Sequence, residues 1–169
     1  MSLIRDIKIQ DAEEIGRIFN YYVLNSISTF ELEAISVIQF QQKIEAHPKR
    51  LPWLVYVENE KVLGYAKAGD WKSGIYNKSA YVNTYESSVY VENESLGRGI
   101  GSHLYAELLA RLKDLRYHSV LGGIALPNSE SVTLHEKFGF RKVAHFEELG
   151  FKLGKRIDVG YWQKMNPDR

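Results

Sequence analysis

A glycine-rich stretch holds the first residues whose types and spacing could do chemistry. Three glycines, at 97, 99 and 101, follow an alternating run from Glu86 to Val91, and leucines at helical spacing follow the glycines. Glycine lets a backbone approach a ligand closely, and the first N–H groups of a helix have no acceptor within the helix. Such a loop can bind an anion, typically a phosphate. A tight turn that binds nothing has the same composition, so the loop alone does not separate the two interpretations.

Two common phosphate loops do not fit this stretch. A nucleotide P-loop requires Gly-x-x-x-x-Gly-Lys-Ser/Thr and a dinucleotide loop Gly-x-Gly-x-x-Gly, whereas these residues read Gly-x-Gly-x-Gly with no Lys-Ser or Lys-Thr pair. They resemble instead the acyl-CoA pyrophosphate loop of the Gcn5-related N-acetyltransferases (GNAT), Gln/Arg-x-x-Gly-x-Gly/Ala, with Gly99 and Gly101 as its glycines. Leu96 stands where that family usually has Gln or Arg. Because the loop binds mainly through backbone N–H groups, this departure weakens the motif more than the chemistry.

Composition limits the class of protein. The 169 residues, 44% of them hydrophobic, fit one domain spanning 1–169. A formal net charge of +1 gives no field to hold nucleic acid or an anionic membrane, so a small molecule is the expected partner. The chain has no cysteine, which excludes disulfides, thiolate metal ligands and a cysteine nucleophile. No apolar run reaches the length of a signal peptide or a membrane span, so we expect a cytoplasmic protein.

Hydrophobic periodicity and turn residues predict the elements that must position these groups. Capping boxes at Asp11 with Glu14 and at Ser36 with Gln39 each precede a helix, and a loop over residues 25–34 connects the two helices. A third helix is expected up to about residue 116 and a fourth over 128–139. Strands are expected at 4–9, 53–58, 62–68, 79–91, 119–125, 140–151 and 156–163. The predicted order is β-α-α-β-β-β-α-β-α-β-β.

A second motif extends the resemblance to nearly the whole chain. NSESVTLHEKFGF, residues 128–140, resembles the GNAT motif Asn-x-x-(Ala/Ser)-x-x-Leu-Tyr-Glu-Lys-x-Gly-Phe. The resemblance implies the GNAT acyl-CoA N-acyltransferase fold, an α/β fold whose mixed sheet is splayed between strands 4 and 5, and acetyl-CoA as co-substrate. GDWKS, ESSVYV, LPNSESVTLHEKFGF and LGFKLGKRIDVGYWQ resemble more narrowly the phosphinothricin and methionine-sulfoximine acetyltransferases. That group implies direct attack by a small amine acceptor in a ternary complex, and a homodimer.

Two residues are candidates for the catalytic chemistry. Amide formation from a thioester needs a base for the proton of the amine, and Glu86 lies within an alternating strand where burial would raise its pKa. A strand Glu is more often solvated or paired with Lys, but the narrower group has its catalytic Glu at this place. His135 occupies the position where the wider family has a Tyr that protonates the departing thiolate. A histidine on a helix face is equally a packed, hydrogen-bonded residue.

The resemblance also assigns residues to acetyl-CoA. The backbone of Val89, Tyr90 and Val91 would pair with the pantetheine arm as though it were a missing strand, and would supply the oxyanion donor. The pyrophosphate would lie on Gly97, Arg98, Gly99, Ile100, Gly101 and Ser102. Asn128 would bind the pantetheine arm, although an N-cap is an equally good role for it. Lys137 could reach the phosphates or stay solvated.

The amine acceptor is expected on the other side of the sheet opening. Its walls would be the loop over residues 26–34 and the GDWKS stretch, in which Trp71, Lys72, Ser73 and Gly74 would lie near Glu86, although Trp71 could equally be a core residue and Lys72 solvated. No metal is predicted, because the remaining histidines (His47, His103, His118 and His145) lack metal-ligand spacing. A protein or peptide acetyltransferase and a non-catalytic acyl-CoA sensor remain alternatives.

Overall fold

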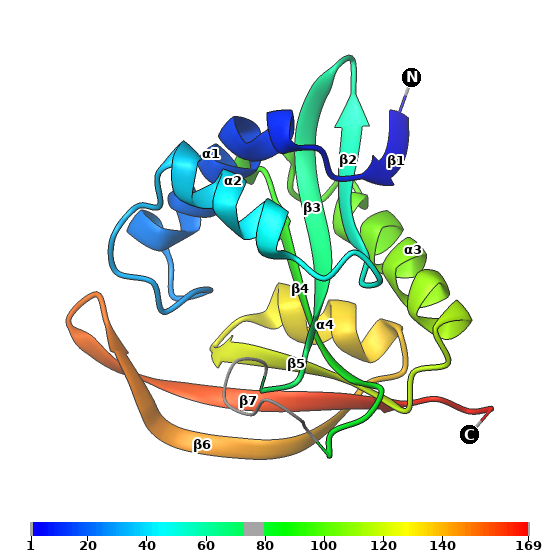
Figure 1. The fold of residues 1–169 in the computed structure, drawn as a ribbon. Coiled ribbons are helices and arrows are strands. Elements are labelled where there is room, and N and C mark those ends of the chain that lie inside the picture. The colour runs from blue at the N-terminus through cyan, green and yellow to red at the C-terminus, as the bar shows by residue number, and fades with distance from the viewer. Residues whose placement is uncertain (1, 73–79, 169) are drawn as a thin grey trace.

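The computed structural model describes residues 2–72 and 80–168, which fold around one twisted sheet (Figure 1). The strands are β1 (Ser2–Asp6), β2 (Trp53–Glu58), β3 (Lys61–Asp70), β4 (Thr84–Val91), β5 (Ser119–Leu126), β6 (Arg141–Lys152) and β7 (Lys155–Met165). The helices are α1 (Ala12–Asn25), α2 (Val37–Ala46), α3 (Ile100–Asp114) and α4 (Ser129–Lys137), with short 3-10 turns at Ile9–Asp11 and Asn93–Ser95. The predicted order of strands and α-helices is confirmed.

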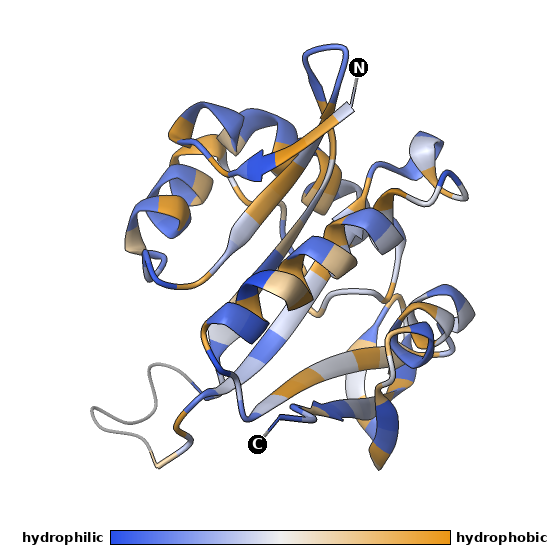
Figure 2. Ribbon diagram, turned by 90° about the vertical axis from the view of Figure 1, so that its right-hand side faces the viewer, coloured by the Kyte–Doolittle hydropathy of each residue, from blue (hydrophilic) through white to orange (hydrophobic). Residues whose placement is uncertain are grey.

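The sheet order is β1-β2-β3-β4-β5-β7-β6, and β4 with β5 is its parallel pair. Apolar side chains cover both faces. Leu104, Leu108 and Leu112 of α3 are fully buried against one face, while Ile15 and Ile18 of α1 pack with the other. Figure 2, viewed from the side of α3, shows hydrophilic and hydrophobic segments alternating along this helix, as its leucine spacing predicts.

The sheet opens between β4 and β5. These strands pair from Thr84–Ser119 to Glu86–Leu121, and beyond Glu86 no described residue of β5 stands in register with β4. Figure 1 shows β4 continuing along β3 while β5 runs beside β7 below it. The splayed mixed sheet predicted from the family resemblance is therefore present, and the opening begins at Glu86.

Some predicted boundaries and one cap are wrong. β1 ends at Asp6 because Ile9–Asp11 forms a 3-10 turn, and β4 begins at Thr84 rather than at residue 79, which lies outside the described residues. Asp11 does not cap α1: its carboxylate accepts hydrogen bonds from Arg5 and from the Lys8 N–H. Sequence spacing cannot reveal that competing partner. The other capping box, Ser36 with Gln39, is confirmed.

The β6–β7 hairpin reaches across to the loop between α1 and α2, residues 26–36 and hereafter the α1–α2 loop. Lys152 is only 4% exposed, and its ammonium donates to the Thr29 carbonyl at 2.7 Å. A Cβ on Gly150 would lie 2.1 Å from the ring of Phe30, so glycine is needed for this close approach. The hairpin therefore holds the α1–α2 loop in place beside the sheet opening.

Candidate active site

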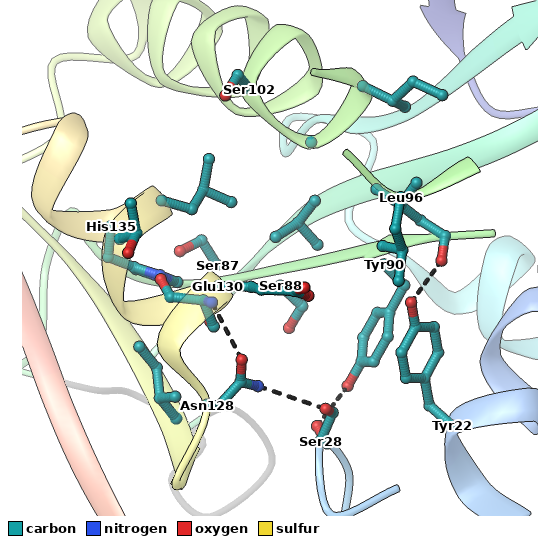
Figure 3. Close-up of a pocket in the computed structure, with 18 of the residues that line it drawn as sticks. Tyr22, Ser28, Ser87, Ser88, Tyr90, Leu96, Ser102, Asn128, Glu130 and His135 are labelled. Carbon is teal, nitrogen blue, oxygen red and sulfur yellow. Dashed lines mark hydrogen bonds between the residues drawn. The ribbon is translucent and has the colours of Figure 1, made fainter. Parts of the chain in front are cut away.

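A pocket of about 450 Å³ occupies the opening between β4 and β5 (Figure 3). Its walls come from α1, the α1–α2 loop, β4, β5 and α4, together with the first turn of α3 and the residues that precede it. The lining residues are Tyr22, Ser28, Ser87, Ser88, Val89, Tyr90, Val91, Ser95, Leu96, Gly97, Gly99, Ile100, Gly101, Ser102, Gly123, Ile124, Ala125, Asn128, Glu130, Ser131, Thr133, Leu134, His135 and Lys137. The structure thus brings together most of the residues predicted to bind acetyl-CoA.

The glycine loop, residues 97–101, ends in the first turn of α3 at one side of the pocket. Gly97 and Gly99 have φ of +75° and +79°, values that side chains of L-residues rarely adopt. Gly99 is the N-cap of α3 and has no side chain to bond the first-turn N–H groups, which stay available to an anion. Lys137 donates to Ser102 Oγ at 3.0 Å, so a cation lies beside the same turn. These features fit a pyrophosphate.

Arg98 does not take part in the pocket. Its side chain is turned away and pairs with Glu58 on β2 at 2.6 Å, and it is absent from the lining. The prediction that Arg98 binds the co-substrate therefore finds no side-chain contact to support it. A partner 40 residues away in the sequence could not be inferred from the loop motif.

Alternate residues of β4 direct their backbone N–H and C=O groups into the opening. The Glu92 N–H donates to the Leu63 carbonyl of β3, and alternate residues of an antiparallel strand direct their hydrogen-bonding groups to the same neighbour. Tyr90 therefore points its backbone toward β3, whereas Val89 and Val91 point theirs into the opening. Of the three residues predicted to pair with the pantetheine arm through their backbone, only the two valines are oriented to do so.

Tyr22 is a pocket residue that sequence reasoning missed. Its hydroxyl donates to the Val91 carbonyl at 2.6 Å, which uses one lone pair of a carbonyl that faces the opening. Burial raises the pKa of Tyr22 to about 12, so the hydroxyl is neutral and can donate. The spacing of Tyr22 from Ile15 and Ile18 is typical of one helix face, but such periodicity does not show where a hydroxyl finds its partner.

Asn128 joins the two sides of the pocket. Its Oδ1 accepts from the Ser131 N–H at 3.0 Å, which confirms the N-cap, and its Nδ2 donates to Ser28 Oγ at 3.4 Å. Tyr90 donates through its hydroxyl to the Ser28 carbonyl at 3.2 Å, and Figure 3 shows the three side chains converging. The α1–α2 loop is thereby held against both α4 and β4 at the pocket wall.

His135 is buried in the pocket wall, with 4% of its surface exposed. Its Nδ1 donates to the Ser131 carbonyl at 2.7 Å, since a carbonyl can only accept. Burial lowers the pKa of His135, so the ring is neutral and Nε2 carries a lone pair that has no partner among the described residues. This tautomer accepts a hydrogen bond at Nε2. Donating a proton to a thiolate requires a second proton there, which burial opposes.

Glu86 lies at the last register pair of β4 with β5, where the opening begins. It is half-buried outside the pocket lining, two residues before Ser88, which does line the pocket and shares its face of β4. Burial raises the pKa of Glu86, and the positive charge of Lys67 partly opposes that shift. A carboxylate whose pKa moves toward neutrality is suited to accept a proton.

The GDWKS stretch is described only in part. Trp71 packs edge-on against Tyr161 of β7 at 5.6 Å between ring centres. Lys72 is exposed, with its ammonium 5.7 Å from the Tyr81 ring. Ser73 and Gly74, also predicted to bind the amine, lie outside the described residues.

Residues 2–72 and 80–168, which the structure describes, lack both a metal-ligand cluster and a membrane-spanning helix. Within these ranges no three His, Asp or Glu side chains gather as metal ligands would. No helix in the same ranges has the length and hydrophobicity needed to cross a membrane.

A mixed sheet opened between β4 and β5, with a glycine loop at the start of the helix after β4, defines the class of acyl-CoA-dependent acyltransferases. The model of the acetyltransferase (GNAT) domain matches residues 4–160, and the chain belongs to this family. It is an acetyl-CoA-dependent acetyltransferase, as the comparisons with named relatives establish.

Three relatives illustrate the match. Phosphinothricin N-acetyltransferase of Streptomyces coelicolor is 34% identical over 159 residues, 92% of this chain and 91% of the relative. L-methionine sulfoximine/L-methionine sulfone acetyltransferase of Salmonella typhimurium is 31% identical over 154 residues, 90% and 88% of the two chains. A phosphinothricin acetyltransferase of Sinorhizobium meliloti, solved in complex with acetyl-CoA, superimposes with a TM-score of 0.90 at 28% identity, covering 97% and 88%.

Proposed function

We propose that this enzyme transfers the acetyl group of acetyl-CoA to the primary amine of a small amino-acid-like substrate, of the phosphinothricin or methionine-sulfoximine type. The names of the relatives support this substrate class. The single observation that carries the reaction is Glu86, a half-buried carboxylate of raised pKa at the point where β4 leaves β5.

The chain offers a consistent set of groups for holding acetyl-CoA, which supplies the activated acetyl thioester. The N–H groups of the glycine loop and the Lys137 ammonium would hold the pyrophosphate. The N–H groups of Val89 and Val91 face the opening and would bind the pantetheine amides and the carbonyl oxygen under attack. Asn128 borders the same channel and could contribute its amide, in addition to capping α4.

In the proposed mechanism the amine attacks directly in a ternary complex. Glu86 takes a proton from the substrate ammonium, directly or through a water, and the freed nitrogen lone pair forms the new C–N bond as the C–S bond breaks. The first proton moves to a Glu86 carboxylate oxygen, and the acylated nitrogen loses its second proton to the departing thiolate, so that CoA leaves as the free thiol. His135 lines the pocket from the α4 side, and its assistance to the departing thiolate stays a prediction.

A small substrate is favoured over a peptide by the closure of the α1–α2 loop. Lys152, Tyr90 and Asn128 each bond this loop, from β6, β4 and the start of α4. A peptide would need a groove that continues past these contacts. The protein acetyltransferase alternative therefore requires the loop to move.

The homodimer implied by the family resemblance also belongs to this proposal. β6 is one of the two edge strands of the described sheet and exposes large apolar side chains. These are Val143, Phe146, Leu149 and Phe151, with Leu153 at the hairpin turn. An apolar edge strand favours association with another chain. The cytoplasmic location stays a prediction.

The test is a panel of amines assayed for thiol release from acetyl-CoA. Phosphinothricin, methionine sulfoximine, common amino acids, polyamines and a peptide are compared for kcat/KM with the wild type and with Glu86→Gln. The proposal expects the amino-acid analogues to be acetylated best and Glu86→Gln to lose turnover. Acetylation of the peptide alone would refute the small-substrate assignment, and acetyl-CoA binding without any turnover would favour the sensor alternative.

A further inference from the structure

A second charged residue lies beside Glu86 on the same face of the sheet. Lys67 on β3 stands directly opposite Ser88 on β4 and opposite Trp53 on β2. Since Glu86 is two residues before Ser88, Lys67 and Glu86 are diagonal neighbours on adjacent antiparallel strands. Diagonal Cβ atoms are about 7–8 Å apart or somewhat less, within reach of long side chains. A cation and a carboxylate therefore flank one small area at the start of the sheet opening.

The Lys67 ammonium occupies an unusual environment. Its Nζ lies 4.8 Å from the centre of the Trp53 ring, which is 3% exposed. Within the described residues no hydrogen bond or ion pair to Lys67 is found, and its ammonium lies over the face of the Trp53 ring. Burial lowers the pKa of Lys67, and the charge of Lys43 on α2 adds to that effect while Glu86 opposes it. An ammonium withdrawn from water without an anionic partner is costly.

Lys67 and Glu86 do not satisfy each other. No ion pair joins them, and Glu86 likewise has no side-chain hydrogen bond among the described residues. These opposite charges influence each other's pKa without being in contact, so each is left to pair with one end of a ligand that carries both charges. An α-amino acid zwitterion has its ammonium and carboxylate on one carbon atom.

We propose that Lys67 binds the α-carboxylate of the amine substrate, so that Glu86 and Lys67 together select amino acids with a free carboxylate. The inference rests on the proposed function and narrows its substrate class. With the ammonium of the substrate at Glu86, the carboxylate is directed toward Lys67 and supplies the anion that the ammonium lacks. An amine without a carboxylate, such as an amino-acid amide or an internal lysine of a protein, leaves Lys67 unpaired and is bound more weakly.

The test compares L-methionine sulfone with its α-carboxamide at saturating acetyl-CoA. Methionine sulfone has no second anion, so the pair isolates the contribution of the α-carboxylate. We expect the wild type to prefer the free acid in kcat/KM by roughly 10- to 100-fold, the range of a charge-assisted hydrogen bond. In Lys67→Met the KM for the acid should rise until the preference disappears, while the carboxamide is little affected. Lys67→Arg should restore part of the preference.

Lys43→Met is the matched control. Lys43 is exposed on α2 and influences the charge of Lys67, so its removal changes the local field without removing the proposed ligand-binding group. The control should keep the wild-type preference. Melting temperatures of all variants separate a binding effect from a loss of folded protein.

Several results would overturn the inference. If Lys67→Met keeps the preference, Lys67 does not bind the carboxylate. If it loses equal activity on both substrates, with the acidic limb of the pH profile displaced, Lys67 acts only on the ionisation of Glu86. Equal wild-type kcat/KM for acid and carboxamide overturns the inference and leaves the proposed function intact, whereas no acetylation of any amino acid overturns the proposed function itself.

Discussion

Substitutions at Gly122 and His135, made singly and together, would reveal what His135 does. Gly122 is a buried residue of β5, and a Cβ added to it would lie 2.2 Å from His135 Nε2 and 2.5 Å from Cδ2. Nonbonded carbon atoms need about 3.5 Å, so in Gly122→Ala the ring must move by about 1 Å or more. Tyr105 and Phe140 lie edge-on to the ring, with centres at 5.1 and 5.2 Å, and oppose that movement.

The expected cost of Gly122→Ala is therefore that of an overpacked core, about 1–3 kcal/mol in the free energy of unfolding. For a chain of this size that is a loss of roughly 2 to 12 °C in Tm. In a His135→Ala background the new methyl group enters the space left by the ring, so Gly122→Ala should cost little or be stabilising. Urea unfolding of the wild type, the two single variants and the double variant measures this coupling directly.

Turnover of the same four proteins, the wild type and the three variants, separates packing from catalysis. We expect the double variant to regain much of the stability but not the turnover, because the lone pair at Nε2 is lost from the pocket wall. A double variant that recovers both stability and turnover would show that His135 is a packing residue only. Additive stability changes would show that the close approach of Gly122 to His135 is wrong.

Two further predictions concern the loops. Gly99→Val should reduce acetyl-CoA affinity at least 10-fold with the protein still folded, because valine at a φ of +79° distorts the loop that presents the N–H groups; calorimetry measures this, and wild-type affinity would remove the loop from the site. Lys152→Met should lower Tm by a few degrees and raise the KM of the amine substrate, since it frees the Thr29 carbonyl; the exposed Lys155→Met is its control, and equal Tm and KM in both variants would contradict the role of Lys152 in holding the loop.

Local sequence signals predicted most of the scaffold. The Ser36–Gln39 capping box, the neighbouring strands expected at 53–58 and 62–68, and the glycine loop each depend on residues within a few positions of one another, and each is present. Asp11 shows where such signals fail. Its spacing to Glu14 is right for a cap, but the charged Arg5 and the Lys8 N–H bind its carboxylate more effectively.

The parts of the site that the sequence did not reveal depend on long-range register. Tyr22 meets Val91 across 69 positions, and Arg98 turns to Glu58 across 40. Lys67 lies beside Glu86 only because of the register between β3 and β4. Hydrophobic alternation predicts each of these strands but not which of their residues stand opposite one another. The family resemblance located Glu86 and His135, yet it carried no information on the tautomer of the histidine or on the cation next to the glutamate.

The central claim is that Glu86 is the base for a small amino-acid substrate. Because burial raises the pKa of Glu86, the acidic limb of kcat/KM should lie above the ordinary range of a glutamate, and activity should fall as the pH drops through it. The decisive measurement is the pH profile of kcat/KM for wild type and Glu86→Gln with methionine sulfoximine. We expect Glu86→Gln to lose about 10²- to 10⁴-fold in kcat/KM and to lose the acidic limb, with acetyl-CoA affinity unchanged. A Gln variant that keeps both the wild-type rate and the limb would contradict the central claim.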